Sequence, residues 1–246
     1  MIRIARKVHR VTGYVVFIQV ILWILGGVVF SLVPFESLVK GGAVTSPPVA
    51  PAFPANWVNA SRDSLSGLGN VSSLRSHNSS QGVLLEVLSE NQTHWLRLAD
   101  GKPIETPSAT GITRYAATIY TGSGKHLATR RLEEPDSTVL GLVKELYGRK
   151  DVWQVSYDDG AGTRLYFDGP TGRYLTVRND YWVLFDALWR LHIMDYSEGE
   201  NFNNWFLRLF SVLAILFALS GAVLTVNALL RLIRRSSRAS SPAGKV

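Results

Sequence analysis

The sequence predicts a mixed class, membrane α plus α+β, in which two transmembrane helices flank a domain of helices packed on antiparallel strands. Two observations predict it. Residues 11–35 and 209–230 contain no charged side chain, and each run is long enough to cross a hydrocarbon core of about 30 Å as a helix. Between them, short stretches of alternating apolar and polar residues are separated by turn residues, which is typical of strands.

The first apolar run is typical of an uncleaved membrane anchor. A cleaved signal peptide has an apolar core of about 7–15 residues, which this run exceeds, and no cleavage site of small residues follows it directly. The second run is followed by a basic segment, which favours a membrane span over a buried core helix. We therefore expect transmembrane helices at residues 11–35 and 205–230.

Basic side chains without acidic ones occupy the tails at residues 1–10 and 231–246. They are Arg3, Arg6, Lys7 and Arg10 before the first span, and Arg231, Arg234, Arg235, Arg238 and Lys245 after the second. Because Lys and Arg near spans stay in the cytoplasm, we expect both termini there and the central domain on the opposite side, in a periplasm or outside the cell. The net charge of +7 is due to these tails, which leaves no basic stripe for a nucleic acid.

Several chemistries are excluded by residue types that are missing. The chain has no cysteine, so it forms no disulfide, thiolate metal site, cysteine-ligated iron–sulfur cluster or covalent c-type haem. It also lacks a P-loop, a nucleophile elbow and the HExxH zinc motif. The central domain must therefore fold on its apolar core alone.

The domain at residues 56–178 follows a Pro-rich linker at residues 36–55 and contains a pattern that occurs twice. The first copy predicts a helix at 61–68 and strands at 71–77, 82–88 and 94–98. The second predicts a helix that Thr106 caps, with Pro107 as its first residue, and that ends near Tyr120; a strand at 126–132; a short helix at 138–147; and strands at 152–157, 163–167 and 174–177.

An aromatic, amphipathic segment and a loop follow at residues 179–204. The segment carries Tyr181, Trp182, Phe185, Leu188, Trp189 and His192 at helical spacing. Two interpretations remain open. The helix lies at the membrane surface, where Trp and Tyr are favoured, or it packs on the sheet of the domain itself.

Two of the five histidines are candidates for haem ligation. His77, His94 and His126 lie in the domain at no ligand-like spacing, whereas His9 precedes the first span and His192 lies shortly before the second. Neutral imidazole binds haem iron well, and b-type haem needs one ligand on each face of the porphyrin. Since the two histidines are expected on opposite sides of the bilayer, a two-fold dimer would pair each with its mate. The alternative is that both are interfacial polar residues.

Three further residues and a helix face belong to this hypothesis. Met194 is an alternative axial ligand, and Arg10 and Arg190 could meet haem propionates or anchor the helices at the interface. In the spans, Gln19 should bond another helix, and small residues recur at Ser211, Ala214, Ala218 and Ala222, with Gly221 alongside. Either the two spans pack on each other, or the face serves a homodimer or a larger membrane complex.

Three segments resemble the PepSY-associated transmembrane proteins, the iron-regulated membrane proteins of bacteria. They are KVHRVTGY at residues 7–14, like the HRxxG entry to the first span of that family; TRLYFDGPTG at 163–172, like the PepSY closing hairpin; and LWRLHIMDY at 188–196, like the family's LHxMD segment. The resemblance implies a periplasmic PepSY-like domain, which is a helix packed on a small antiparallel sheet. It also implies that the protein is anchored in the bacterial inner membrane.

The resemblance also implies two rival functions. Larger members have four or more spans and look like haem-containing reductases that deliver electrons to ferric siderophores, and His9 and His192 match their haem histidines. This chain has only two spans, so an electron-transfer role with haem b requires dimerisation or a partner subunit. PepSY domains elsewhere accompany protease propeptides, so the alternative is a non-catalytic binding or regulatory module, or an accessory subunit of a membrane complex.

Overall fold

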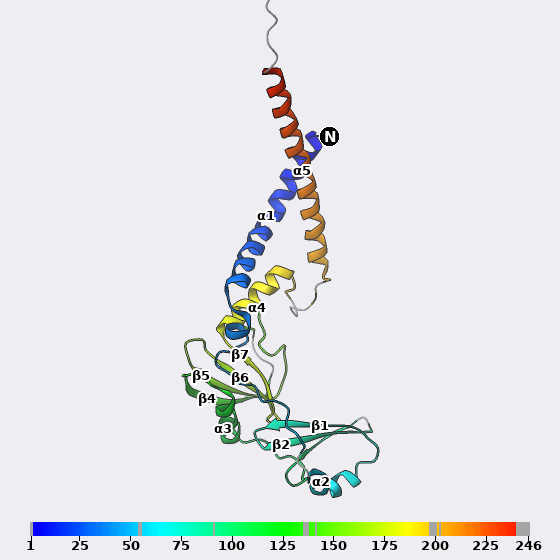
Figure 1. Cartoon of the computed structure of the whole chain (residues 1–246), viewed down its shortest axis with the longest axis vertical. Coiled ribbons are helices and arrows are strands. Elements are labelled where there is room, and N and C mark those ends of the chain that lie inside the picture. Colours follow the sequence, from blue (N-terminus) through cyan, green and yellow to red (C-terminus); the bar gives the residue numbers. More distant parts are fainter. Residues whose placement is uncertain are drawn as a thin grey trace, which may run out of the picture. The chain divides into compact units, whose positions relative to one another are not determined.

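The computed structural model divides into two compact units, which are described separately. One comprises Met1–Val29 with Leu188–Val246, and the other is Phe30–Ala187. The structure describes residues 2–53, 56–90, 92–134, 138–140, 142–196, 201 and 203–239. Two long apolar helices belong to the first unit, and the antiparallel sheets with their short helices form the second (Figure 1).

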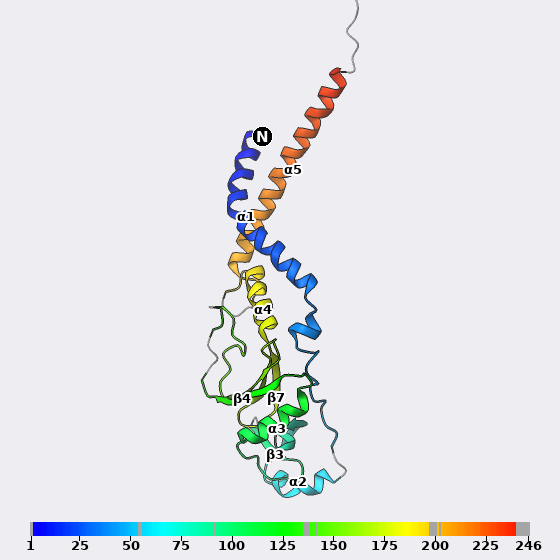
Figure 2. The same cartoon turned by 90° about the vertical axis from the view of Figure 1, so that its left-hand side faces the viewer.

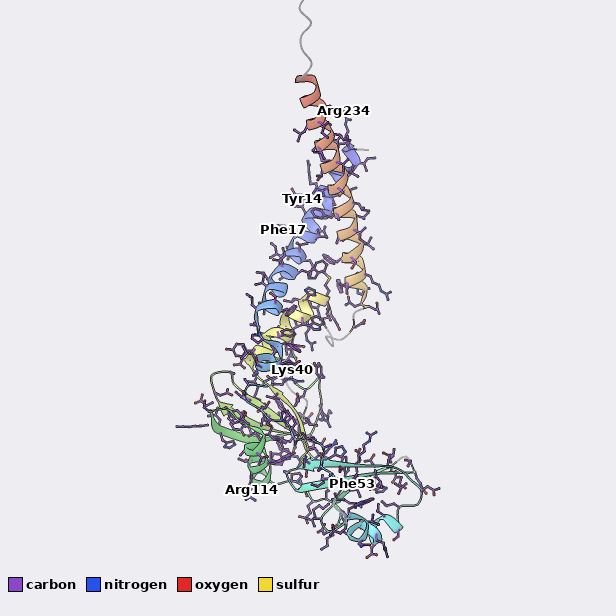
Figure 3. All side chains as sticks on the ribbon, in the orientation of Figure 1. Tyr14, Phe17, Lys40, Phe53, Arg114 and Arg234 are labelled. Carbon is purple, nitrogen blue, oxygen red and sulfur yellow. The ribbon has the colours of Figure 1, made fainter. Side chains whose placement is uncertain are left out.

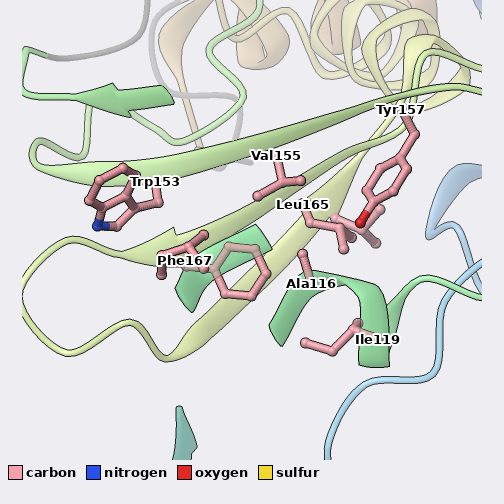
Figure 4. Packing of buried hydrophobic residues seen from close by; sticks show 9 residues of the cluster. Ala116, Ile119, Trp153, Val155, Tyr157, Leu165 and Phe167 are labelled. Atoms are coloured by element: carbon pink, nitrogen blue, oxygen red, sulfur yellow. The ribbon is translucent and has the colours of Figure 1, made fainter. Parts of the chain in front are cut away.

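The larger sheet of the second unit is a four-stranded antiparallel meander that one helix covers. Its strands follow in the order β4 (Lys125–Leu132), β5 (Val152–Asp158), β6 (Arg164–Asp168) and β7 (Tyr174–Arg178). Helix α3 (Ala109–Ile119) packs on one face, where Trp153, Val155 and Tyr157 alternate with polar residues along β5 and point toward Ala116 and Ile119 (Figure 4). Polar and apolar residues therefore alternate along β5 because every second side chain of a strand faces the same side of the sheet.

Helix α3 begins later than the sequence suggests. The predicted cap at Thr106 is wrong: Ser108 has an extended backbone, and its Oγ accepts a hydrogen bond of 3.1 Å from the backbone N–H of Gly111. Pro107 therefore precedes the helix. Ser108 is the better cap because the apolar positions that must face the sheet begin at Ile112, one turn further on.

The smaller sheet repeats the plan of a helix followed by an antiparallel meander. Helix α2 (Trp57–Ser66) precedes β1 (Val71–Ser79), β2 (Gly82–Ser89) and β3 (Gln92–Arg97). Leu85, Val87 and Leu96 are buried against Trp57 and Leu65 of α2. The strands predicted from alternation are confirmed in both sheets, with ends that differ by a few residues.

The short helix predicted at residues 138–147 is wrong for the described part of that segment. Val139 and Val143 instead exchange backbone hydrogen bonds of 2.7 and 2.9 Å in an isolated bridge. Leu140 and Tyr147 have φ angles of 53° and 54°, which a right-handed helix does not contain. This turn structure buries Val143 beside Trp182, so tertiary packing overrides the local helical spacing.

The expected linker at residues 36–55 is only partly extended. Phe35–Val39 forms a single π-helical turn, η1, and Val39 is fully buried. Thr45 then bridges to Tyr120, and the N–H of Ser46 donates to the carbonyl of Ile119. The first half of the segment is therefore part of the folded unit, because its apolar residues find a core that composition alone does not reveal.

In the first unit, α1 (Ile2–Leu32) and α5 (Trp205–Ala239) each contain a stretch long and apolar enough to cross a membrane. The two helices cross in both views (Figure 1, Figure 2). Large apolar side chains such as Tyr14 and Phe17 point outward from α1 (Figure 3). Apolar side chains exposed along two such helices indicate a lipid bilayer as their environment.

Candidate functional site in the helical unit

His9 lies on α1 against α5. Its ring stacks on that of Phe217, with 4.2 Å between centroids and 10° between planes. Its Nδ1 is 3.1 Å from the backbone carbonyl oxygen of Phe217 and 3.3 Å from Oγ of Ser220. Because a carbonyl oxygen only accepts, this hydrogen bond requires the hydrogen on Nδ1, and in the neutral ring the lone pair is then on Nε2. The contact therefore sets the tautomer in which Nε2 can bind a metal.

Two glycines allow this contact. A Cβ atom on Gly221 would lie 3.1 Å from Cε1 of His9, and one on Gly13 would lie 3.2 Å from Cε2 of Phe217. Small residues let membrane helices approach closely, and here they admit an imidazole and a phenyl ring between the helices. Phe217 and Gly221 also lie near the middle of the uncharged run of α5, so this helix gives His9 apolar surroundings.

His192 lies near the end of α4 (Asp180–Ile193), where three side chains bind the terminal carbonyls. Gln19 Nε2 donates to the carbonyl oxygen of Leu191 at 3.0 Å, and Trp23 Nε1 donates to that of His192 at 2.8 Å. Asn204 Nδ2 donates to that of Ile193 at 2.9 Å. The last carbonyls of a helix have no partner within the helix, so these donors complete the end of α4.

The contact with Trp23 places His192 along α1. Trp23 is the midpoint of the uncharged run at residues 11–35, so the end of α4 lies beside the middle of this run. Along α1, His9 and Trp23 are separated by about 21 Å, at 1.5 Å per residue. A single haem therefore cannot take both His9 and His192 of one chain as axial ligands.

The ring of His192 has two tryptophan rings near it. Trp189 is parallel to it, with 6.2 Å between centroids, and Trp23 is tilted at 6.0 Å. Met194 follows with a φ of 54°, which ends the helix, and its side chain is buried. Arg190 is 1% exposed and has protein contacts of its own, whereas Arg10 is exposed. Of the two arginines, only Arg10 is accessible to a haem propionate without rearrangement.

Of the small residues predicted as a packing face on α5, Gly221 lies against α1, and three of the others are exposed. Ser211, Ala218 and Ala222 are exposed and Ala214 is half-buried, while Phe217, Ser220 and Gly221 face His9. Sequence reasoning missed Phe217, Ser220, Trp23 and Asn204. The spacing of Trp23 four residues after Gln19, on the same helical face, was the available signal.

A second polar centre lies in the domain, outside the predicted site. The carboxylate of Glu145, buried, accepts hydrogen bonds from Arg164 at 2.6 and 3.1 Å and from the hydroxyl of Tyr166. Gln154 Nε2 donates to the same hydroxyl at 2.7 Å. Burial, together with the negative charge of Glu145, raises the pKa of Tyr166. The sequence did not reveal this centre because Glu145 lies in the segment expected to be helical.

Across the residues that the structure describes, no group of three or more His, Cys, Asp or Glu side chains is arranged to hold a metal ion. Comparison of the chain with protein-family models, curated proteins and solved structures finds no match. The assignment of function therefore depends on the site itself.

Proposed function

We propose that this chain is a transmembrane electron-transfer subunit that carries haem b and passes electrons across a bacterial inner membrane to a periplasmic acceptor, such as a ferric iron complex. Both termini are cytoplasmic in this proposal, and α3 with β4–β7 forms a periplasmic PepSY-like domain. The observation that carries it is the hydrogen bond from Nδ1 of His9 to the carbonyl of Phe217, which in the neutral ring puts the lone pair on Nε2.

Each residue has a specific role. The bond to Phe217 holds the imidazole plane and raises the basicity of Nε2, as carbonyl partners do for metal-binding histidines generally. Arg10, exposed beside His9, would bind a propionate. Haem iron supplies one-electron transfer when bound. His9 and His192 are too far apart to share one haem, so each would pair with its mate in a homodimer or with a histidine of a partner subunit.

The test is a reduced-minus-oxidised visible spectrum of the full chain, purified in mild detergent from haem-sufficient cells. We expect the sharp α-band of six-coordinate haem b. The variants His9→Ala and His192→Ala should each lose about half of the haem, because each removes one of two sites. His126→Ala is the matched control, since its ring lies on the exposed strand β4. A folded chain without a Soret band, purified together with its native partners, would overturn the proposal.

A further inference from the structure

Strand β4 forms one edge of the larger sheet. It pairs with β5 on one side, and no strand in the described part of the chain pairs with its other side (Figure 1). An open edge presents unpaired backbone N–H and C=O groups, which are a template for a further strand. The edge is therefore able to bind an extended segment through backbone hydrogen bonds alone.

Two hollows flank this edge, one on each face of the sheet. Thr129 points toward α3, since its Oγ1 is 2.6 Å from that of Thr113, and the hollow of about 640 Å³ on that side is lined by both of them. Arg130, the next residue, lines a second hollow of about 980 Å³ with Leu132. Side chains of a strand alternate between faces, so an added strand would place its side chains alternately in the two hollows.

The charge along β4 indicates which kind of partner segment would bind there. Strand β4 contains Lys125, Arg130 and Arg131 and no acidic residue. Arg131 forms an ion pair with Asp151 at 2.8 Å, whereas Lys125 and Arg130 are exposed and have no ion pair with any described residue. On the α3 side, Arg114, which is labelled in Figure 3, is one of the residues that line the smaller hollow. A second copy of this chain would bring like charges together, which is unfavourable between paired strands. An acidic segment would be complementary.

The remaining lining indicates where acidic and apolar side chains would lie. On the floor of the larger hollow, Glu145 is already neutralised by Arg164. Its rim includes Val139, Leu184 and Leu140, of which Leu140 is 70% exposed. Glu133 and Glu134, which follow β4, also line the larger hollow, as does Asp180, which pairs with Arg164. None of the described residues that line the smaller hollow is acidic. Acidic side chains therefore suit the smaller hollow and the stretch opposite Lys125 and Arg130, and apolar ones suit the rim of the larger hollow.

We propose that β4 binds an extended, acidic segment of a partner protein, which joins the sheet as a fifth strand with its side chains in the two hollows. The inference is independent of haem, since no residue of the helical unit takes part. It makes the domain a recognition module for the protein with which the membrane unit works.

The test is selection of random nonapeptides displayed on phage against the full chain in nanodiscs of neutral phosphatidylcholine. We expect the selected peptides to be enriched in Asp and Glu. Binding of the synthetic peptides should weaken about tenfold in Arg130→Glu, and hydrogen exchange should slow at amides of β4. Alternate N-methylation of a selected peptide should abolish its binding, because methylation removes the hydrogen-bond donors that face β4.

Arg75→Glu is the matched control, because Arg75 is an exposed arginine on β1, an edge strand of the smaller sheet. It should leave peptide binding unchanged. Failure to select peptides, selection without acidic enrichment, equal binding to Arg130→Glu, or protection that maps elsewhere would each overturn the proposal. Unchanged binding after N-methylation would show attraction by charge without strand addition, and would overturn it too.

Discussion

At the scale of single residues, the geometry of His9 depends on Gly221 of the facing helix. We predict that Gly221→Ala displaces the imidazole, because the added Cβ would lie 3.1 Å from Cε1 of His9 and the ring must move. In haem-loaded protein, the α-band should broaden or shift, and the haem content at the His9 site should fall several-fold.

Gly27→Ala is the control for this prediction. Gly27 is also within a span, but an added Cβ there would meet no atom within 4 Å. Alanine should stabilise α1 by at most about 1 kcal/mol through helix propensity and leave the spectrum unchanged. If Gly221→Ala also left the spectrum unchanged, the close contact between Gly221 and His9 would have no effect on haem binding.

Asp159 is a turn residue whose ionisation makes the unfolding free energy of the domain depend on pH. Its carboxylate accepts hydrogen bonds from the N–H groups of Ala161 and Thr163 at 3.2 and 3.1 Å and from the hydroxyl of Tyr120 at 3.1 Å. Burial opposes ionisation, but these hydrogen bonds outweigh it and hold the pKa of the carboxyl below its usual 3.8. The ionised form therefore stabilises the folded domain.

We predict that Asp159→Asn removes a stabilisation that is present above about pH 4 and is lost as the pH falls through the lowered pKa of the folded state. The difference in unfolding free energy between the parent and Asp159→Asn should be constant above about pH 5 and shrink below about pH 4. Thermal unfolding followed by tryptophan fluorescence measures it. The exposed neighbour Asp158 provides the control Asp158→Asn, and a difference that did not vary with pH would contradict the assignment.

At the scale of elements, the alternation of apolar and polar residues predicted the strands correctly, and the length of the apolar runs predicted the two long helices. Helical spacing within one short segment did not predict its structure correctly. The strands were predictable because a half-buried strand must alternate, and the spans because a helix satisfies its backbone hydrogen bonds in lipid within one segment. Residues 138–147 have helical spacing as well, yet Val139 pairs with Val143. In so short a segment, nucleation is costly and packing decides the structure.

The end of α4 shows why the membrane site was only half predictable. A glutamine within a span must find a hydrogen-bonding partner, so Gln19 was recognised. Its partner is the carbonyl of Leu191, 172 positions away in the chain, and Trp23 binds the next carbonyl. Backbone carbonyls carry no sequence signal, so only the folded structure identifies α4 as the partner.

At the scale of the domain, Arg173 links the two sheets. Its Nη1 donates to Nδ1 of His77 at 3.2 Å, and its guanidinium lies 4.5 Å from the ring centroid of Trp95. Since arginine only donates, Nε2 of His77 carries the hydrogen and donates to Glu86 at 2.6 Å. A backbone bridge from Ser79 to Arg173 continues the same junction.

We predict that Arg173→Met loosens this junction, because it removes the hydrogen bond and the cation–π contact while retaining the apolar stem. The cost should be about 1–3 kcal/mol. Hydrogen exchange should accelerate in β1 near Ser79 and remain unchanged in β5 and β6. Arg114→Met, at an exposed position of α3, is the control and should alter neither region. Uniform acceleration through both sheets would contradict a local link.

The sequence by itself determined the two apolar spans, the strands and the absence of thiol chemistry, because these depend on local periodicity, length and residue type. Tertiary structure alone decided which nitrogen of His9 donates to Phe217, which helix Gln19 binds, and where the open edge and its hollows lie. The physical reason is the distance between partners along the chain. The bond from His9 to Phe217 joins residues 208 positions apart, and no local pattern encodes such a pairing.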